Sequence, residues 1–397
     1  MSLPEVHLVA GTRAEAARLA PVTTAMHAAG LLAPVLVAGA RHPDRVASTF
    51  AAFDLIPDVT LKIERDTGNR AELLTAIIGH LDALWAGRTP AAVLVQGDTT
   101  ASLAGALAAG WRRIPVVHLA AGQRSREFDP PFPGEANRRL VAQLATLHLA
   151  ATPLAAMNLL DEHIAVGDVL ITGSTTADAA LALAARRLPF ENLQVAAAVR
   201  AGSASRLAVV TAHRRESWGA PLDRILAAVR RLVRRYADLD VILPGHPNPA
   251  VSAQIEAGIG GIARVTITDP LPYPDLARLL RQAYLVLTDS DDLLEVAPAF
   301  GVPALALREV TERGEALHAG CARHVGSDTD LIVREAGDLL DSRSLHDAMA
   351  TAGNPYGDGL AAFRTAQATA AQLGLADWPE PMPALDEGSP SCRARQR

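Results

Sequence analysis

Short apolar runs of strand length alternate with helical patterns along the whole chain. A first series lies at residues 6–10, 34–38, 92–96, 116–119, 148–152 and 170–172. A second series lies at residues 207–212, 240–244, 265–268, 285–288 and 302–307. Strands that alternate with helices form a parallel sheet whose two faces are both covered. The pattern therefore predicts an α/β protein with two doubly wound domains.

The two series are separated by a region rich in Ala and Arg, residues 174–205. A length of 397 residues also fits two domains better than a single core. We place the first domain at residues 1–175 and the second at residues 176–355. The polar, Ser-rich end of the chain predicts a disordered tail at residues 379–397.

Several predicted strands end in small or polar residues, which mark one edge of each sheet. These clusters are residues 10–13, 97–100, 212–215 and 288–290. In open α/β sheets, ligands bind beyond the carboxyl ends of the strands. We therefore expect the active site there, in a cleft between the two domains.

The charge balance and the aromatic content exclude several classes of partner. Lys and Arg number 37 against 43 Asp and Glu, a net charge of −6, and Lys62 is the only lysine. This balance argues against electrostatic binding to nucleic acid. Seven Phe, four Trp and four Tyr are too few for a platform that stacks bases. The two cysteines, Cys321 and Cys392, provide neither a disulfide framework nor a metal cluster.

The apolar stretches do not predict membrane segments, and we expect a cytoplasmic protein. The first 14 residues carry no basic leader, and Glu5 lies within their apolar run, so they do not resemble a signal peptide. Residues 19–40 and 140–160 are uncharged and long enough to span a membrane. Because Pro34 and Pro153 interrupt them, each is predicted to hold a helix, a turn and a strand.

Two strand-end motifs each allow a structural and a functional interpretation. Gly11, Thr12 and Arg13 lie before a predicted helix, where backbone N–H groups and an arginine suit a phosphate. A helix cap with a surface arginine explains these residues equally well. Asp98 is either a carboxylate in the cleft or the N-cap of the following helix, and the motif taken alone favours the cap.

His213 stands at a strand end, directly before two arginines and a glutamate. Three side chains that can carry positive charge favour an anionic ligand, whereas a buried core histidine is the alternative. The segment at residues 129–134 holds three prolines before a helix predicted at residues 135–144. Such a stiff loop either lines a site or only connects two elements.

Nine segments, in this order, resemble those of one enzyme family. They are GTRAEA at residues 11–16, QGDTT at 96–100, EANR at 135–138, ITGST at 171–175, TAHRRES at 211–217, HPNP at 246–249, LTDS at 287–290, TER at 311–313 and NPYGDG at 354–359. The chain resembles the non-hydrolysing UDP-N-acetylglucosamine 2-epimerases, which share their fold with the GT-B glycosyltransferases. The resemblance implies two Rossmann-like domains facing across a cleft, a helix at residues 356–378 that returns to the first domain, and a homodimer.

The resemblance also implies a reaction on a nucleotide sugar that requires no cofactor. In the family a base takes the C2 proton, UDP leaves to give a 2-acetamidoglucal, and both add back with C2 inverted. By resemblance, Asp98 and His213 are catalytic, and Arg18 stands where the family usually has lysine. The residues implied to bind substrate are Arg13, Arg18, Arg138, His213, Ser290, Asp291, Asp292, Glu295 and Arg313.

Several positions in this pocket depart from the family pattern. The two catalytic glutamates of the family are replaced here by Ala120 and Gly134. Asp291 and Asp292 replace the two glycines of the loop that admits phosphate. The glutamate that would hold the ribose hydroxyls is Val296.

These replacements predict weak binding of ordinary UDP. A carboxylate about 4 Å from a phosphate costs roughly 4 kcal/mol at an effective dielectric constant of about 20, or about a thousandfold in affinity. The cost is avoided if Asp291 and Asp292 point elsewhere, if Mg²⁺ bridges them to the diphosphate, or if the ligand carries a cation there. We expect no other metal.

Three acids lie close in sequence to the missing glutamate at position 134 and are candidates to replace it, although a surface role is the simpler explanation for each. They are Glu127, Asp129 and Glu135. Residues 40–43 also differ from the allosteric segment of the family. Activation by a second UDP-N-acetylglucosamine is therefore not expected.

Three functional hypotheses follow from the sequence. The one we favour is an epimerase-like enzyme that acts at C1 or C2 of a nucleotide sugar, with altered chemistry or substrate. The second is a hydrolase or transferase on the same scaffold that retains Asp98 and His213. The third is a non-catalytic pseudoenzyme that binds a metabolite or a protein partner.

Overall fold

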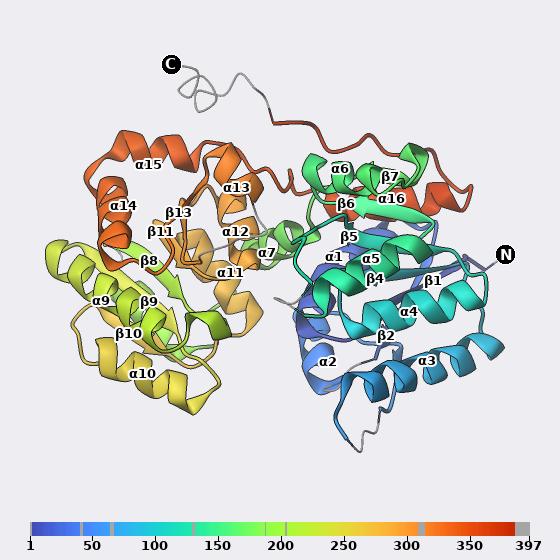
Figure 1. Cartoon of the computed structure of the whole chain (residues 1–397), viewed down its shortest axis with the longest axis horizontal. Helices are drawn as coiled ribbons and strands as arrows, with labels where there is room; N and C mark the ends of the chain where they lie inside the picture. Colours follow the sequence, from blue (N-terminus) through green and yellow to red (C-terminus); the bar gives the residue numbers. More distant parts are fainter. Residues whose placement is uncertain are drawn as a thin grey trace. The chain divides into compact units, whose positions relative to one another are not determined.

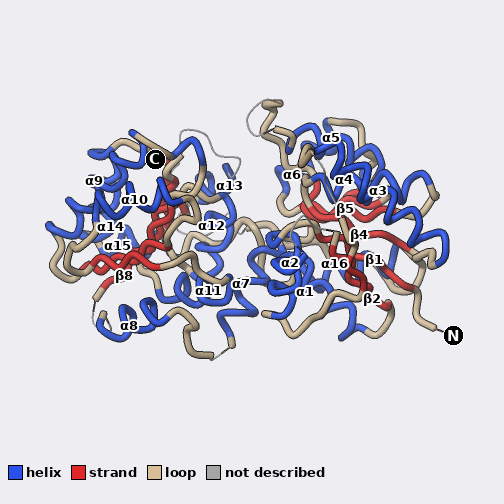
Figure 2. The backbone as a smooth tube through the Cα atoms, turned by 90° about the horizontal axis from the view of Figure 1, so that it is seen from below, coloured by secondary structure: helices blue, strands red, loops and turns tan. Residues whose placement is uncertain are grey.

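The computed structural model describes residues 2–39, 43–63, 67–128, 132–186, 188–202, 205–308 and 314–385. The chain divides into two compact units: unit 1 comprises Met1–Ala179 and Tyr356–Ala384, and unit 2 comprises Ala180–Pro355 and Leu385–Arg397. In each unit helices enclose the strands (Figure 2). The predicted α/β protein with two doubly wound sheets is confirmed.

Unit 1 holds a seven-stranded sheet in the order β3-β2-β1-β4-β5-β6-β7, in which every neighbouring pair is parallel. Its strands are β1 (Glu5–Ala10), β2 (Ala33–Ala38), β3 (Val59–Thr60), β4 (Ala92–Gln96), β5 (Val116–Ala121), β6 (Leu147–Ala150) and β7 (Val169–Ile171). Val9, Val37 and Val95 from three neighbouring strands share one buried core with Trp85. Helices cover both faces of the sheet, so its strands are mostly apolar, with buried histidines in β1, β5 and β6.

Several helices of unit 1 begin after a short polar side chain that caps them. They are α1 (Arg13–Ala29), α2 (Pro43–Ala51), α3 (Arg70–Gly87), α4 (Thr100–Trp111), α5 (Gly134–Leu144), α6 (Pro153–Asp161), the first part of α7 (Thr175–Ala185), α16 (Ala361–Gln372) and the short 3₁₀ helix η1 (Val166–Asp168). Thr12, Thr99 and Thr152 are N-caps whose hydroxyls accept from a backbone N–H three residues on. Asp98 is therefore not the cap of α4, because the residue after it has that role.

Unit 2 holds a six-stranded parallel sheet in the order β10-β9-β8-β11-β12-β13. Its strands are β8 (Arg206–Thr211), β9 (Leu239–Pro244), β10 (Val265–Thr268), β11 (Leu285–Thr288), β12 (Ala304–Ala306) and β13 (Ala322–His324). Its helices are the rest of α7, α8 (Leu193–Ala201), α9 (Ala220–Arg235), α10 (Pro249–Ile259), α11 (Tyr273–Gln282), α12 (Asp291–Val296), α13 (Gly314–Ala319), α14 (Thr329–Asp341) and α15 (Arg343–Ala350), with 3₁₀ helices η2 (Arg215–Ser217) and η3 (Ala297–Phe300). Helix α9 buries Leu222, Ile225 and Val229 against this sheet, at the spacing of one helix face.

The end of the chain completes unit 1. Helix α16 packs against α1 (Figure 1). Its Ala362 N–H donates to the Asp178 carboxylate at 2.7 Å, and the Ser174 N–H donates to the Tyr356 carbonyl at 2.6 Å. The Met382 N–H donates to the Ile171 carbonyl, so ordered contacts extend into the segment that we assigned to the tail. Residues 386–397 lie outside the described part of the chain.

Each sheet reverses its strand order once, and this point locates a ligand crevice. The reversal falls between β1 and β4 in unit 1 and between β8 and β11 in unit 2. In doubly wound sheets, ligands bind beyond the carboxyl ends of the strands at this switch point. The polar clusters found in the sequence follow these four strands. No helix among the described residues is both long and apolar enough to cross a bilayer.

Candidate functional site

In unit 1, the turn after β1 serves as a helix cap. Thr12 accepts from the Glu15 N–H at 3.2 Å, and α1 begins at the exposed Arg13. Position 11 has no room for a side chain, because a Cβ there would lie 2.3 Å from the Cβ of Ala101. The cap interpretation of this motif is thus observed, and the phosphate interpretation stays a prediction for Arg13.

A buried glutamate joins the loops that follow β1 and β4. Glu15 is 1% exposed and accepts from the Gly11 N–H at 2.9 Å, the Thr99 hydroxyl at 2.5 Å and the Ser102 hydroxyl at 2.7 Å. The sequence did not single out Glu15. Its signal is an acid four residues after a strand-end glycine, on the first turn of a helix.

Burial favours the protonated form of Glu15. Burial raises the pKa of Glu15, and its hydroxyl and backbone N–H donors oppose that rise. Ser102 carries one hydroxyl proton, yet its Oγ lies 2.7 Å from Glu15 Oε1 and 2.5 Å from the Gln96 carbonyl. A proton on Glu15 satisfies both contacts, because the Ser102 hydroxyl can then accept from Glu15 and donate to Gln96.

Asp98 lies beside this bridge and forms an ion pair with Arg138. The two side chains meet at 2.7 Å, with 32% of the Asp98 side chain and 9% of the Arg138 side chain exposed. The Asn137 amide donates to the Asp98 carbonyl at 2.8 Å, which fixes the turn. The structure thus brings together two of the sequence-predicted site residues of this unit. A single partly exposed carboxylate with a buried guanidinium can remove a proton or stabilise a leaving anion.

The structure describes both positions at which the sequence resemblance implies a glutamate in the family, Gly134 and Ala120. A Cβ on Gly134 would lie 2.7 Å from Asp98 Oδ2, so the Asp98 carboxylate occupies the space that a side chain at position 134 would need. Ala120 has a left-handed φ of 56° at an irregularity in the pairing of β5. This conformation is costly for a residue with a Cβ, and strain of this kind concentrates at functional sites.

The candidate replacement acids differ in position. Glu135 is fully buried and accepts from the Ser125 N–H at 2.9 Å and from Arg139 at 2.9 Å, so it anchors the loop before α5. Glu127 is exposed on that loop. Asp129 lies outside the described residues.

Arg18 projects from α1 toward the start of α7. Its guanidinium donates to the Thr176 hydroxyl at 3.0 Å and to the Gln96 side-chain oxygen at 3.3 Å. Gln96 ends β4, two residues before Asp98. Arg18 is therefore positioned near this strand end by polar contacts within unit 1.

In unit 2, Asp289 joins the loops after β8 and β11. It is fully buried and accepts from the His213 N–H at 3.0 Å, the Arg214 N–H at 2.9 Å and the Ser217 hydroxyl at 2.7 Å. In the sequence this aspartate stands only within the LTDS motif at residues 287–290. Its signal is a carboxylate directly after a buried strand.

His213 is held as a neutral side chain at neutral pH. Burial lowers the pKa of His213, Asp289 opposes this shift, and His246 adds to it. The rings of His213 and His246 stack with centroids 5.7 Å apart. Three residues were expected to carry positive charge here. Of these, His213 is instead a neutral donor or acceptor. Arg214 is paired with an acid.

Asp291 is held between two arginines. Its Oδ2 accepts from Arg214 and from Arg308, each at 2.6 Å, and 7% of its side chain is exposed. Arg308 was not predicted as a site residue from the sequence, because it lies outside the recognised motifs. Ser290 precedes α12 and makes no side-chain cap hydrogen bond.

The other substrate-binding candidates of unit 2 are spread over the same short helix and a later segment. Asp292 is half-buried and Glu295 is 1% exposed, both on α12. Arg313 lies outside the described residues. Among the described residues, no group of three or more His, Cys, Asp and Glu side chains could hold a metal ion.

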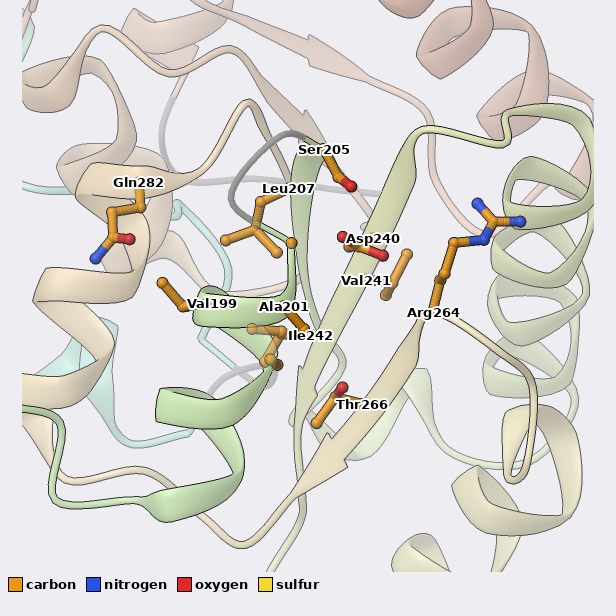
Figure 3. Close-up of a pocket in the computed structure, with 12 residues that line it drawn as sticks. Val199, Ala201, Ser205, Leu207, Asp240, Val241, Ile242, Arg264, Thr266 and Gln282 are labelled. Carbon is orange, nitrogen blue, oxygen red and sulfur yellow. The ribbon is translucent and has the colours of Figure 1, made fainter.

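A separate cavity of about 550 Å³ lies at the amino ends of β8, β9 and β10, lined by Leu207, Asp240 and Thr266 among others (Figure 3). This is the edge of the sheet opposite His213. Arg264 points away from it toward a helix (Figure 3), and its guanidinium donates to the carbonyls of Val233, Tyr236 and Leu239. That arginine thus caps the end of α9, and the cavity holds none of the predicted site residues.

Two doubly wound parallel sheets, each with charged residues at its switch point, define the GT-B-like class of α/β proteins. Residues 24–370 match the family model described as UDP-N-acetylglucosamine 2-epimerase. The chain belongs to this family, as the sequence motifs predicted.

Named relatives and solved structures agree with this assignment. The chain is 35% identical over 367 residues to the UDP-N-acetylglucosamine 2-epimerase of Escherichia coli (strain K12). The match covers 92% of this chain and 98% of the relative. A co-structure of S. aureus MnaA with UDP is 33% identical, with a TM-score of 0.87 over 96% of this chain and all of that one. The Neisseria meningitidis UDP-GlcNAc 2-epimerase bound to UDP-GlcNAc is 32% identical, with a TM-score of 0.81 over 90% and 97%.

Proposed function

We propose that the chain binds a UDP-activated amino sugar and acts on it at C1 or C2, with chemistry that departs from full epimerisation. Membership of the family supports the nucleotide-sugar ligand. The solved relatives that carry UDP and UDP-GlcNAc support the same class. The departure in chemistry rests on the residues around Asp98.

The observation that carries this proposal is the geometry of Asp98 and Gly134. Inversion at C2 removes a proton from one face of the sugar and delivers one to the other, which calls for more than one placed acid or base. Asp98 fills the space beside Gly134, Ala120 has no titratable group, and Glu135 is committed to Ser125 and Arg139. Asp98 is then the group of unit 1 that exchanges a proton with the substrate.

Proton NMR of the protein with UDP-N-acetylglucosamine in D₂O, with and without Mg²⁺, tests this function. We expect release of UDP together with the 2-acetamidoglucal that remains when the C2 proton and UDP are lost, with little manno epimer. Efficient formation of the manno epimer with deuterium at C2 would show that other residues replace the missing glutamates and would refute the altered chemistry. The Mg²⁺ arm reports whether an ion bridging Asp291 and Asp292 is needed.

Substitution of Asp98 gives the proposal a residue-level test. Asp98→Asn should slow the reaction by about a hundredfold or more, because the amide cannot take a proton. Asp82→Asn is the matched control, since Asp82 also pairs with an arginine in unit 1, Arg112, but on the exposed surface. Equal loss in both variants would point to stability and not to chemistry.

Hydrolysis or transfer at C1 is the second candidate function. The partial exposure of Asp98 favours it, because water or an acceptor hydroxyl needs access to the reacting carboxylate. The same NMR experiment separates this candidate from C2 chemistry: UDP appears together with a free or transferred sugar, and no deuterium enters at C2. A pseudoenzyme would give neither product.

A further inference from the structure

The switch point of unit 2 holds a pair of arginines that converge on one oxygen. Arg214 comes from the loop after β8, and Arg308 follows β12. Their guanidinium nitrogens both lie 2.6 Å from Asp291 Oδ2. Two guanidinium groups that meet at one point form a site for an anionic oxygen, because each offers planar N–H donors.

The anionic group in this site is the Asp291 carboxylate of the same chain. The side chains of Asp291 and Arg308 are 7% and 10% exposed, and that of Arg214 is 30% exposed. Glu216 adds a second carboxylate, 3.7 Å from both arginines. Both arginines are therefore already paired with carboxylates of the chain.

A phosphoryl group that enters this corner meets a carboxylate that already holds both arginines. It must displace Asp291 or bind beside it, and like charges a few ångströms apart in a partly buried site repel strongly. The penalty grows with the negative charge of the ligand and vanishes for a neutral one. Asp291 therefore discriminates between ligands by their charge.

Resting on the proposed function, we propose that Asp291 is a specificity-determining residue: an internal counter-ion of Arg214 and Arg308 that weakens the hold of unit 2 on a ligand's diphosphate. The uridine part of a ligand is not affected by this competition. The residue acts on binding and takes no part in bond breaking.

Calorimetric titration of the full chain with UDP, UMP, uridine and inorganic pyrophosphate tests the proposal. Asp291→Asn keeps the shape of the side chain and removes its charge. We expect affinity for UDP and pyrophosphate to rise by between about tenfold and about a thousandfold, and the change for uridine to stay within about threefold. UMP should fall between these limits.

Two controls separate the local effect from general electrostatics and from misfolding. Asp330→Asn makes the same change in net charge at an exposed pair with Arg231 in the same unit, and should leave UDP affinity unchanged. Arg308→Gln added to Asp291→Asn should remove most of the gain. Asp291→Gly provides a second variant if the asparagine protein does not fold, as judged by its thermal midpoint.

The outcomes distinguish this proposal from the function on which it rests. Unchanged UDP and pyrophosphate affinity in both Asp291 variants would overturn it, even if the chain reacts with a nucleotide sugar. A gain for pyrophosphate without any reaction on nucleotide sugars would support the counter-ion and refute the function. An equal gain for uridine would also overturn it, since the effect would then not depend on charge.

Discussion

In both units a buried carboxyl group joins the loops after the two central strands, but its donors differ. Glu15 in unit 1 accepts from two hydroxyls and one backbone N–H, whereas Asp289 in unit 2 accepts from two backbone N–H groups and one hydroxyl. A hydroxyl can reverse its role and accept, but a backbone N–H can only donate. Unit 1 can therefore hold a protonated acid at its switch point, while unit 2 needs both carboxylate oxygens as acceptors.

The neighbouring carboxylates show the same contrast. Asp98 in unit 1 pairs with one arginine and stays partly exposed, whereas Asp291 in unit 2 is enclosed by two. Unit 1 thus keeps a group that can exchange protons, and unit 2 keeps its charges paired. Under the function proposed above, we expect proton transfer at Asp98 in unit 1 and ligand selection at Asp291 in unit 2.

The largest effect should come from neutralising Asp289, with the same change at Glu15 as the comparison. Asp289→Asn should lower the free energy of unfolding by about 3 kcal/mol or more, because the amide N–H₂ faces donors that are buried and cannot turn. Glu15→Gln should cost less than about 1 kcal/mol at pH 7. Urea denaturation followed by circular dichroism measures both, and equal losses would break the comparison.

The stability of the Glu15→Gln variant relative to the native chain should also change with pH, in a direction that can be predicted. Because burial raises the pKa of Glu15, its contribution is full below about pH 4.5 and is lost as pH rises through the folded-state pKa. The variant should therefore gain stability relative to the native chain as the pH rises above about 4.5. Parallel stability curves for the two proteins would show that Glu15 does not titrate differently on folding.

Acidification should weaken unit 1 through its buried histidines. Burial lowers the pKa of His118 to about 3 and of His148 to about 4, and the His118 ring contacts the Gly97 carbonyl in the loop after β4. The unfolded chain takes up these protons near pH 6.5, so stability falls as pH drops below that value toward the folded-state pKa values. The loss should reach up to about 2 kcal/mol for each histidine between pH 6.5 and pH 5.

The double variant His118→Gln, His148→Gln checks the source of this acid sensitivity. Its stability should change less over the same range, as measured by thermal unfolding at a series of pH values. If it loses stability as steeply as the native chain, the titrating groups lie elsewhere.

A smaller effect should follow Gly134→Ala. The new Cβ would lie 2.7 Å from Asp98 Oδ2, so Asp98 must turn and its pair with Arg138 weakens. We expect a loss of about 1 kcal/mol. Asp98→Ala removes the conflicting atom, so Gly134→Ala made in that background should cost nothing, and a double-mutant cycle measures the coupling. Additive effects would place the two residues apart.

The smallest predicted effect has the opposite sign. Ala120→Gly should raise the free energy of unfolding by about 0.5 to 1 kcal/mol, because glycine adopts the observed φ of 56° without strain. Ala121→Gly, at the next position of the strand, is the control and should destabilise the protein. Destabilisation by both would show that the backbone at Ala120 is not strained.

Local sequence patterns predicted the strands but not the contacts of the site. β4, β10 and β11 match the predicted residues. β4 and β11 are fully buried runs, whereas β10 is partly buried and is recognised by its β-branched residues. β3 and β13 were missed. β3 has only two residues, and β13 (ARH) holds two polar residues among its three, so neither forms an apolar run. The Asp291 partners also escaped prediction, because Arg214 and Arg308 lie 77 and 17 residues away in sequence.

The cap of α4 shows how a single motif misleads. Asp98 and Thr99 are both good N-cap residues, and the sequence offered no reason to prefer the second. The choice is made by tertiary contacts: Arg138 and Asn137 on α5 hold Asp98, which leaves Thr99 to cap the helix. The homodimer and the cytoplasmic location stay predictions.

The return of the chain to unit 1 sets an order of events during synthesis. Almost all of unit 2 is one continuous segment of the chain. Unit 1 lacks its residues from Tyr356 onward until that segment has left the ribosome. Until then the face of α1 that receives α16 is uncovered, and Asp178 lacks the Ala362 N–H. The half of the protein that begins first is therefore completed last, and a chaperone that shields α1 would act in that interval.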